Sequence, residues 1–194
     1  MPINSGMKCH RLIIFYFLAA VLTQGIPVTG LVLDQFWYTS SRLNPDGDCW
    51  NWTLGSDQYK WLRQTLEHGR AHFKFVFIHH LVGGGTPEAR CGIEAAKCSE
   101  WSGCDLNGND VFKEKRQNCK MPIHSLLARN KVNILFHGHD HFFATRDLDR
   151  VVYQLVPRPS ARKFDNTRSE QEYGYVHGDV LSAPCFIRIR ILGL

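Results

Sequence analysis

The chain has 194 residues, of which 44% are hydrophobic and 21% charged, and this composition excludes an intrinsically disordered protein. Its 23 basic and 18 acidic side chains give a net charge of +5. Because the basic residues are dispersed along the chain, no dedicated nucleic-acid-binding face and no nucleic-acid partner are predicted. The length suits one domain with a real hydrophobic core.

The first 25 residues have the features of a secretory signal peptide. Lys8 and Arg11 precede eleven consecutive apolar residues at 12–22, and residues 23–25 offer a possible cleavage point. A membrane-spanning helix would have to continue to residue 33 through Gly25, Pro27 and Gly30, so no stable span is expected. We therefore expect an exported protein, either periplasmic or secreted. The alternative is an accidental leader fused to a truncated reading frame.

Seven cysteines are present, but their spacing does not settle their role. None of them forms the C-x-x-C pair of a zinc knuckle. One or two disulfides in an exported protein are expected, with scattered free thiols as the alternative, and an odd total leaves at least one thiol unpaired. The tripeptide Asn51-Trp52-Thr53 is a glycosylation sequon that matters only in a glycosylating export pathway.

The first half of the chain reads as strand, loop, helix and strand. Residues 31–33 and 36–38 suggest a buried strand interrupted by two polar residues, and 44–54 are rich in Pro, Gly, Asp and Asn, as a loop is. Ser56 can cap a helix that runs to about His68 and stops at Gly69, with one apolar face formed by Tyr59, Leu62 and Leu66. Residues 73–78 are aromatic and β-branched, which favours a buried strand.

The second half adds one long loop and further strands. Residues 81–121 lack periodicity and are expected to form a loop over the site. A helix at 123–129 and strands at 132–136 and 151–156 follow. At 185–191, isoleucines alternate with arginines, which predicts a half-buried strand. This order of elements predicts an α/β fold with a late antiparallel part.

Two of the predicted strands end in histidine. Residues 74–78 lead into His79-His80, and 132–136 lead into His137 and the turn Gly138-His139-Asp140-His141. Imidazoles two residues apart after a glycine can aim two ligands at one metal ion. We expect His79 to be the ligand of its pair, with His80 lining the pocket or hydrogen-bonding behind it. His137 is expected to pack within the strand end.

With these residues in view, the chain resembles the calcineurin-like metallophosphoesterases, the superfamily that includes the purple acid phosphatases. The likeness covers about residues 31–194. It rests on an ordered set of features, namely the helix at 58–66, the strand 75–78 with His79-His80, the turn Gly138-His139-Asp140-His141, and the strand beginning at Val151.

The resemblance implies a fold, a set of ligands and a reaction. It implies the C-terminal part of an α/β/β/α sandwich with mixed sheets, and metal ligation by His79, His139 and His141. It also implies a dinuclear centre of divalent or trivalent Fe, Mn or Zn that activates water against a small-molecule phosphoester. It does not identify a catalytic or substrate-binding residue in this chain.

Three of the family's five metal motifs, D-x-H, G-D-x-x-D and G-N-H-[D/E], do not occur in this sequence. The nearest matches are Asp34-Gln35-Phe36, the stretch 47–51 with an asparagine in place of the second aspartate, and Gly108-Asn109-Asp110, which lies after His79. The chain is therefore expected to be a partial phosphoesterase domain with little or no activity alone.

Two other functions remain open. The stretch 137–141 superficially resembles the metallo-β-lactamase motif H-x-H-x-D-H, but it is one residue short and lies late in the domain. The other alternative is a non-catalytic exported binding module or a degenerate remnant of the same fold. A lactamase would hydrolyse lactams or thioesters and no phosphate ester.

Overall fold

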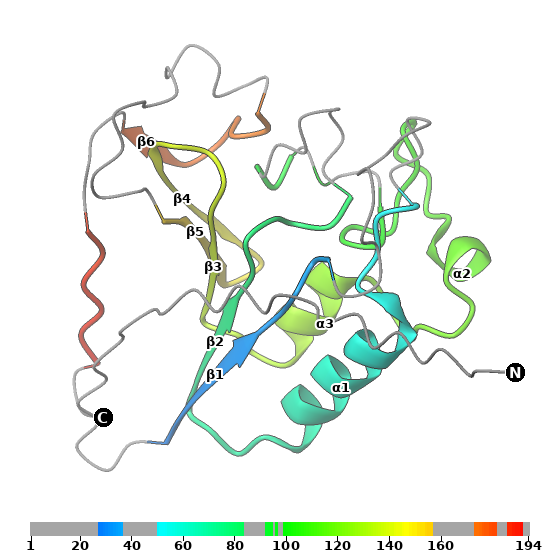
Figure 1. Cartoon of the computed structure of the whole chain (residues 1–194), viewed down its shortest axis with the longest axis horizontal. Helices are drawn as coiled ribbons and strands as arrows, with labels where there is room; N and C mark the ends of the chain where they lie inside the picture. The colour runs from blue at the N-terminus through cyan, green and yellow to red at the C-terminus, as the bar shows by residue number, and fades with distance from the viewer. Residues whose placement is uncertain are drawn as a thin grey trace, which may run out of the picture.

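The computed structural model describes residues 27–36, 50–83, 92–94, 96, 99–156, 173–181 and 186–191, and its centre is one six-stranded mixed sheet (Figure 1). The strands stand in the order β1-β2-β3-β5-β4-β6. Their bounds are β1 Val28–Val32, β2 Phe73–Phe77, β3 Ile134–His137, β4 Phe143–Leu148, β5 Val151–Leu155 and β6 Asp179–Leu181.

The sheet has a parallel half and an antiparallel half. β1 pairs with β2, β2 with β3, and β3 with β5, all in parallel. β4 then pairs antiparallel with both β5 and β6. Because the carboxyl ends of β1, β2 and β3 meet at one edge, the residues that follow these strands are brought side by side.

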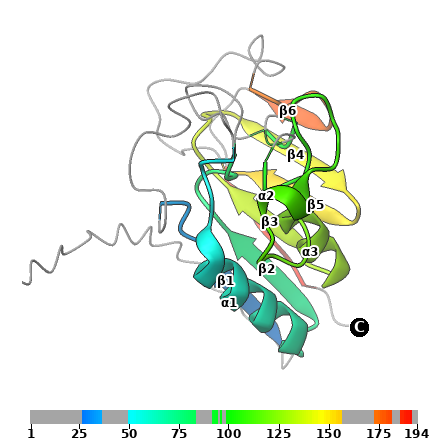
Figure 2. The ribbon, with the colours of Figure 1, turned by 90° about the vertical axis from the view of Figure 1, so that its right-hand side faces the viewer.

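Two helices cover one face of the sheet, α1 (Gly55–His68) and α3 (Ile123–Arg129), as Figure 2 shows from the side. The buried stripe of α1 packs into the same core as the buried residues of α3 and the inward side chains of the strands. From the sheet, Leu31, Val76, Leu135 and Tyr153 belong to this core, and their registers place them on one face.

The opposite face of the sheet carries an aromatic cluster. Phe75 and Phe136 are each 6% exposed, and the ring of Phe136 stacks on that of Phe77 at 4.9 Å between centroids. Val32, on the same face of the edge strand β1, is 73% exposed. Both α1 and α3 lie on the other side of the sheet (Figure 2). Among the described residues, this face is therefore an apolar surface that neither helix covers.

The α/β fold with a late antiparallel part is confirmed, as are the elements at 73–77, 123–129 and 151–155. The long helix is also confirmed. It ends at His68 as predicted, and Gly69 is its C-cap, with a backbone N–H that donates to the Thr65 carbonyl. Ser56 as its cap is wrong, since the helix starts at Gly55 with Leu54 at the N-cap and no side-chain cap. The first strand lies three residues earlier than expected, at Val28–Val32, and residues 35–36 form a turn.

The expected strand at 185–191 is wrong for the residues described there. Residues 186–191 have no regular secondary structure, and Ile189 is 42% exposed rather than turned inward. The alternation of isoleucine and arginine is therefore not enough to form a strand here, because no neighbouring strand in the described sheet pairs with this segment.

Two strands of the structure, β4 and β6, were not predicted. β4 begins directly after the histidine turn and contains charged residues, which hide it from a search for apolar runs.

The region expected to be a long loop contains the short helix α2 (Phe112–Lys115) but is otherwise irregular where it is described. Cys104 and Cys119 are free thiols, while the other five cysteines lie outside the described residues. The expected leader at 1–25 also lies outside them. Within the described ranges, no helix is long and apolar enough to cross a membrane.

Candidate metal centre

The site forms where β2 and β3 end side by side. Beyond the regular strands, the Ile78 amide donates to the Phe136 carbonyl at 3.0 Å, and the Gly138 amide donates to the His79 carbonyl at 3.0 Å. These two hydrogen bonds continue the pairing of the two chains past the strand ends. They bring His79 next to His139, although 60 residues separate the two in the sequence.

Three imidazoles converge at this point. The ring centroids of His80 and His139 are 4.1 Å apart, those of His79 and His80 are 4.5 Å apart, and those of His79 and His139 are 5.7 Å apart. One ring nitrogen from each lies within 4.8 Å of the other two. We call His79, His80 and His139 the histidine cluster.

The backbone is specialised where it meets the cluster. A Cβ atom on Gly138 would lie 2.9 Å from His79 Nδ1, so a side chain there would displace the imidazole. His139 has φ of 80°, a left-handed conformation that costs a non-glycine residue free energy and is concentrated at functional sites. The glycine thus makes room for His79, and the strained turn sets the direction of His139.

Burial keeps His79 and His80 uncharged. Desolvation, followed by the nearby His139 and His141, lowers the pKa of His79 to about 4. Desolvation, followed by His139, His79 and His137, lowers the pKa of His80 to about 2. Neutral imidazole is the form that binds a metal ion, because the ring then keeps a lone pair on one nitrogen. At neutral pH both rings are therefore competent ligands.

The chemistry of these donors fits a borderline divalent cation such as Zn²⁺. Imidazole nitrogen is a preferred zinc ligand at about 2.0–2.1 Å, and tetrahedral ligands of that kind stand about 3.4 Å apart. The cluster nitrogens are within 4.8 Å of one another, so side-chain movements of about 1 Å would close the site. No carboxylate joins the group among the described residues. Three neutral ligands suit one ion with an open position.

Behind the cluster, the turn is tied to the segment 173–181. Asp140 is 1% exposed and accepts a hydrogen bond from the Tyr175 hydroxyl at 2.9 Å. The Tyr175 ring stacks on His137 with centroids 6.1 Å apart. Desolvation, with His79 as a lesser cause, lowers the pKa of His137 to about 3. Asp140 therefore anchors the turn from within the protein.

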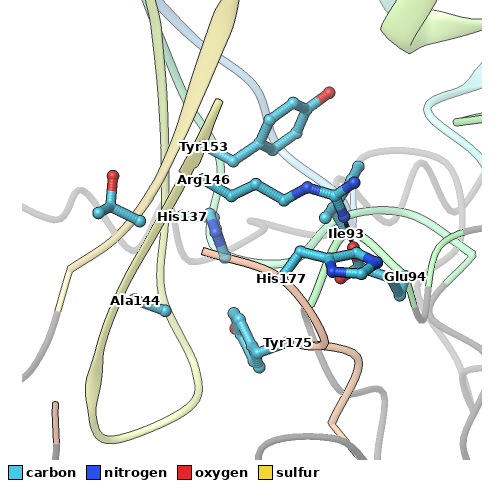
Figure 3. Close-up of a pocket in the computed structure, with 9 residues that line it drawn as sticks. Ile93, Glu94, His137, Ala144, Arg146, Tyr153, Tyr175 and His177 are labelled. Atoms are coloured by element: carbon cyan, nitrogen blue, oxygen red, sulfur yellow. Dashed lines mark ion pairs between the residues drawn. The ribbon is translucent and has the colours of Figure 1, made fainter. Parts of the chain in front are cut away.

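A cavity of about 10 Å³, room for about one water molecule, adjoins His137 (Figure 3). Figure 3 shows Arg146 extending toward Glu94, with which it forms an ion pair, and His177 beside them. His137 Nδ1 has no hydrogen-bond partner among the described side chains and backbone groups. The same Arg146, Glu94 and His177 border a neighbouring cavity of about 250 Å³. The polar lining thus extends from His137 along the helix face of β4.

The structure brings the sequence-predicted ligands together in part. His79 and His139 lie in one cluster, and His141 is close enough to His79 to influence its pKa. His80, expected only to support the pocket, contributes a ring nitrogen to the group itself. His124, expected to lie on the surface or to be structural, bonds to Tyr153 Oη at 2.8 Å and Asp149 at 2.9 Å and so ties α3 to the β4–β5 hairpin.

Sequence reasoning missed Gln35 and Tyr175. Gln35 is 5% exposed and its amide nitrogen lies 3.3 Å from His80 Nδ1. Both residues come from segments distant in sequence from the histidines, and no local motif marks them. For Gln35 the one available signal was a polar residue that interrupts an apolar strand pattern.

Comparison with known proteins adds no family assignment: no protein-family model matches the chain, and no curated protein matches it.

Proposed function

We propose that this chain is part of a metal-dependent phosphoester hydrolase of the calcineurin-like kind, and that it binds one divalent metal ion with little or no turnover by itself. The observation that carries the proposal is the convergence of His79 and His139 at the carboxyl ends of two parallel strands. His80 supplies the third ligand. His141, close enough to His79 to lower its pKa, is proposed to stand beside the open position of the ion.

The fold supports this proposal. In the family that the sequence resembles, two mixed sheets pack face to face between helical layers. This sheet has α1 and α3 on one face and the apolar cluster of Phe75, Phe77 and Phe136 on the other. That apolar face is where the second sheet of an α/β/β/α sandwich would pack.

The metal ion would supply Lewis-acid polarisation of a phosphoryl oxygen and a water of lowered pKa. The chain's own residues contribute position and electrostatics. His79 and His80 stay neutral through burial and so remain ligands rather than cations that would repel the ion. Asp140, held by Tyr175, fixes the turn that carries His139.

The lack of carboxylates in the cluster explains why turnover should be weak. A dinuclear centre holds two cations about 4 Å apart and needs a bridging carboxylate to offset their charge. The described residues that form this group are imidazoles alone. A single ion on three neutral ligands can bind a phosphate oxygen, but the clamp on both attacking and leaving oxygens is missing.

Metal stoichiometry tests the proposal directly. The purified full chain is stripped with EDTA, dialysed against Zn²⁺ or Mn²⁺, and its bound metal is measured by mass spectrometry of the digested sample. We expect about one ion per chain, lost in His139→Ala and retained in His72→Ala, a variant of an exposed histidine away from the cluster. No His139-dependent metal would refute the proposal. About two ions would mean that unrecognised carboxylates complete a dinuclear site.

Activity distinguishes the partial enzyme from a complete one. With p-nitrophenyl phosphate and bis(p-nitrophenyl) phosphate we expect rates at or little above the uncatalysed rate. Metal-dependent hydrolysis that vanishes in His139→Ala would overturn the proposed inactivity.

The DNA sequence upstream of codon 1 distinguishes the partial enzyme from the alternative, a binding module or degenerate remnant. A partial enzyme predicts D-x-H, G-D-x-x-D and G-N-H-D coding sequence there, whereas a binding module predicts unrelated DNA.

A further inference from the structure

His80 is surrounded by the rings of two aromatic residues and of the other two histidines of the cluster. It is 5% exposed, and its ring meets that of Trp52 edge-on at 5.4 Å and that of Phe36 at 5.7 Å. The rings of His139 and His79 are also close to it, with centroids 4.1 Å and 4.5 Å away. The imidazole is therefore confined by packing, and its two nitrogens are in different surroundings.

Nδ1 is the ring nitrogen of His80 that is not available to a metal ion, because the Gln35 side chain is hydrogen-bonded to it. The Gln35 amide nitrogen lies 3.3 Å from His80 Nδ1, and both side chains are buried. No other hydrogen-bonding side chain is recorded at that nitrogen in the described structure. Nε2 is then the atom of His80 left to meet an ion between the three rings.

Gln35 is itself held in place from several directions. Its backbone carbonyl accepts a hydrogen bond from Trp52 Nε1 at 3.0 Å. The turn that carries it is fixed to β2 by the Leu33 amide, which donates to the Phe77 carbonyl at 2.8 Å. The Gln58 side chain clamps the same turn, accepting from the Asp34 amide and donating to the Asp34 carbonyl, each at 2.8 Å. The backbone that carries the Gln35 side chain is thus fixed by the fold.

A glutamine at this place can serve both states of His80. A neutral imidazole has one N–H donor and one acceptor nitrogen. Without a metal ion, the amide N–H donates to Nδ1, so the proton of His80 is on Nε2. When Nε2 is a ligand, the proton moves to Nδ1, and the amide must turn over so that its oxygen accepts from Nδ1–H. Partners of this kind fix the tautomer and orientation of ligating histidines.

We propose that Gln35 is a positioning residue that orients His80 and selects Nε2 as its metal-binding nitrogen. The metal-binding half of this inference rests on the function proposed above. The orientation of His80 by Gln35 does not, because it can be measured without metal.

The metal arm compares Zn²⁺ affinity by competition with a chromophoric chelator in wild type, Gln35→Leu and Gln35→Glu. We expect Gln35→Leu to bind Zn²⁺ about 10- to 100-fold more weakly, since the partner of Nδ1 is lost. Gln35→Glu should bind at least as tightly as wild type, because a carboxylate accepts from Nδ1–H. The control Gln154→Leu removes a glutamine of similar burial that bonds only to backbone carbonyls, and should match wild type. Wild-type affinity in Gln35→Leu would overturn the inference.

The metal-free arm measures the tautomer of His80 by long-range ¹H–¹⁵N correlation at pH 8 in protein stripped with EDTA. Wild type should show the proton on Nε2, and Gln35→Glu should move it to Nδ1, because a carboxylate can only accept. A proton on Nδ1 in wild type, or on Nε2 in Gln35→Glu, would overturn the orientation by Gln35. If wild type binds no Zn²⁺, the proposed function fails, and this arm alone decides the role of Gln35.

Discussion

Lowering the pH should destabilise the metal-free protein through its buried neutral histidines, and His137 offers the clearest test. Its pKa is lowered to about 3 by burial, and that of His80 is lowered to about 2. In the unfolded chain both groups have the ordinary value of about 6.5. Below pH 6.5 the unfolded state therefore binds protons that the folded state does not. The stability these groups contribute is complete above that pH and is lost as pH falls toward the folded values.

The size of the effect follows from this linkage. Between pH 7 and pH 5, one histidine that stays neutral in the folded state lowers the free energy of unfolding by about 2 kcal/mol. His80 and His137 together give a loss of about 4 kcal/mol, a large share of the roughly 5–15 kcal/mol available to a domain. His79, whose pKa is lowered to about 4, also stays mostly neutral in the folded state down to pH 5 and adds a loss of similar size.

The test is urea unfolding in EDTA at pH 8, 7, 6 and 5, followed by circular dichroism, for wild type and His137→Phe. Phenylalanine keeps a ring against Tyr175, on which His137 stacks with planes 8° apart. Between pH 7 and 5 the variant should lose about 2 kcal/mol less than wild type. Equal losses in the two proteins, within about 0.5 kcal/mol, would refute the reasoning that His137 is buried and uncharged.

Three further predictions concern the cluster and the core. Gly138→Ala should weaken Zn²⁺ binding at least about tenfold in the chelator competition, because the new methyl group would lie 2.9 Å from His79 Nδ1; unchanged affinity would contradict that close approach. Glu100→Gln should lower the urea-derived free energy of unfolding by about 3–5 kcal/mol. This carboxylate, 4% exposed, accepts from the Leu54 amide and from Arg116 Nε, whereas a glutamine has only one acceptor oxygen and leaves Arg116 without its counter-charge; a loss below 1 kcal/mol would count against it. Tyr153→Phe should lower the free energy of unfolding by about 1–3 kcal/mol in the same assay, because the Tyr153 hydroxyl accepts from the indole N–H of Trp101 and bonds to His124. A stabilised variant would contradict that network.

The strands and helices with clear periodicity were predictable from sequence. The helix with Tyr59, Leu62 and Leu66 on one face was found because burial on one side leaves a 3.6-residue pattern. The strand 73–77 was found because aromatic and β-branched residues fill both of its buried faces. β4 was missed because Arg146 and Asp147 interrupt its apolar residues. The expected strand at 185–191 is not formed by the described residues 186–191, so alternation without a pairing partner means little.

The histidine cluster was predictable only in part, for a physical reason. Strand-end histidines in parallel strands must share an edge of the sheet, which placed His79 beside His139 in advance. Which neighbouring imidazole completes the group depends on side-chain packing, and the aromatic enclosure of His80 by Trp52 and Phe36 has no local sequence signal. Gln35 could be recognised only once the pairing of β1 with β2 was known.

The parallel pairing of β2 with β3 also has a consequence for how the chain folds. Its register joins Phe75 to Ile134, so the contact closes a loop of about 60 residues, with an entropic cost on the order of 4 kcal/mol. Proteins dominated by such distant contacts fold slowly, because the chain loses the entropy of loop closure before the contacts stabilise it. The imidazoles of His79 and His139 meet only after this closure. Capture of a metal ion during refolding would therefore mark a late event and time the completion of the sheet's centre.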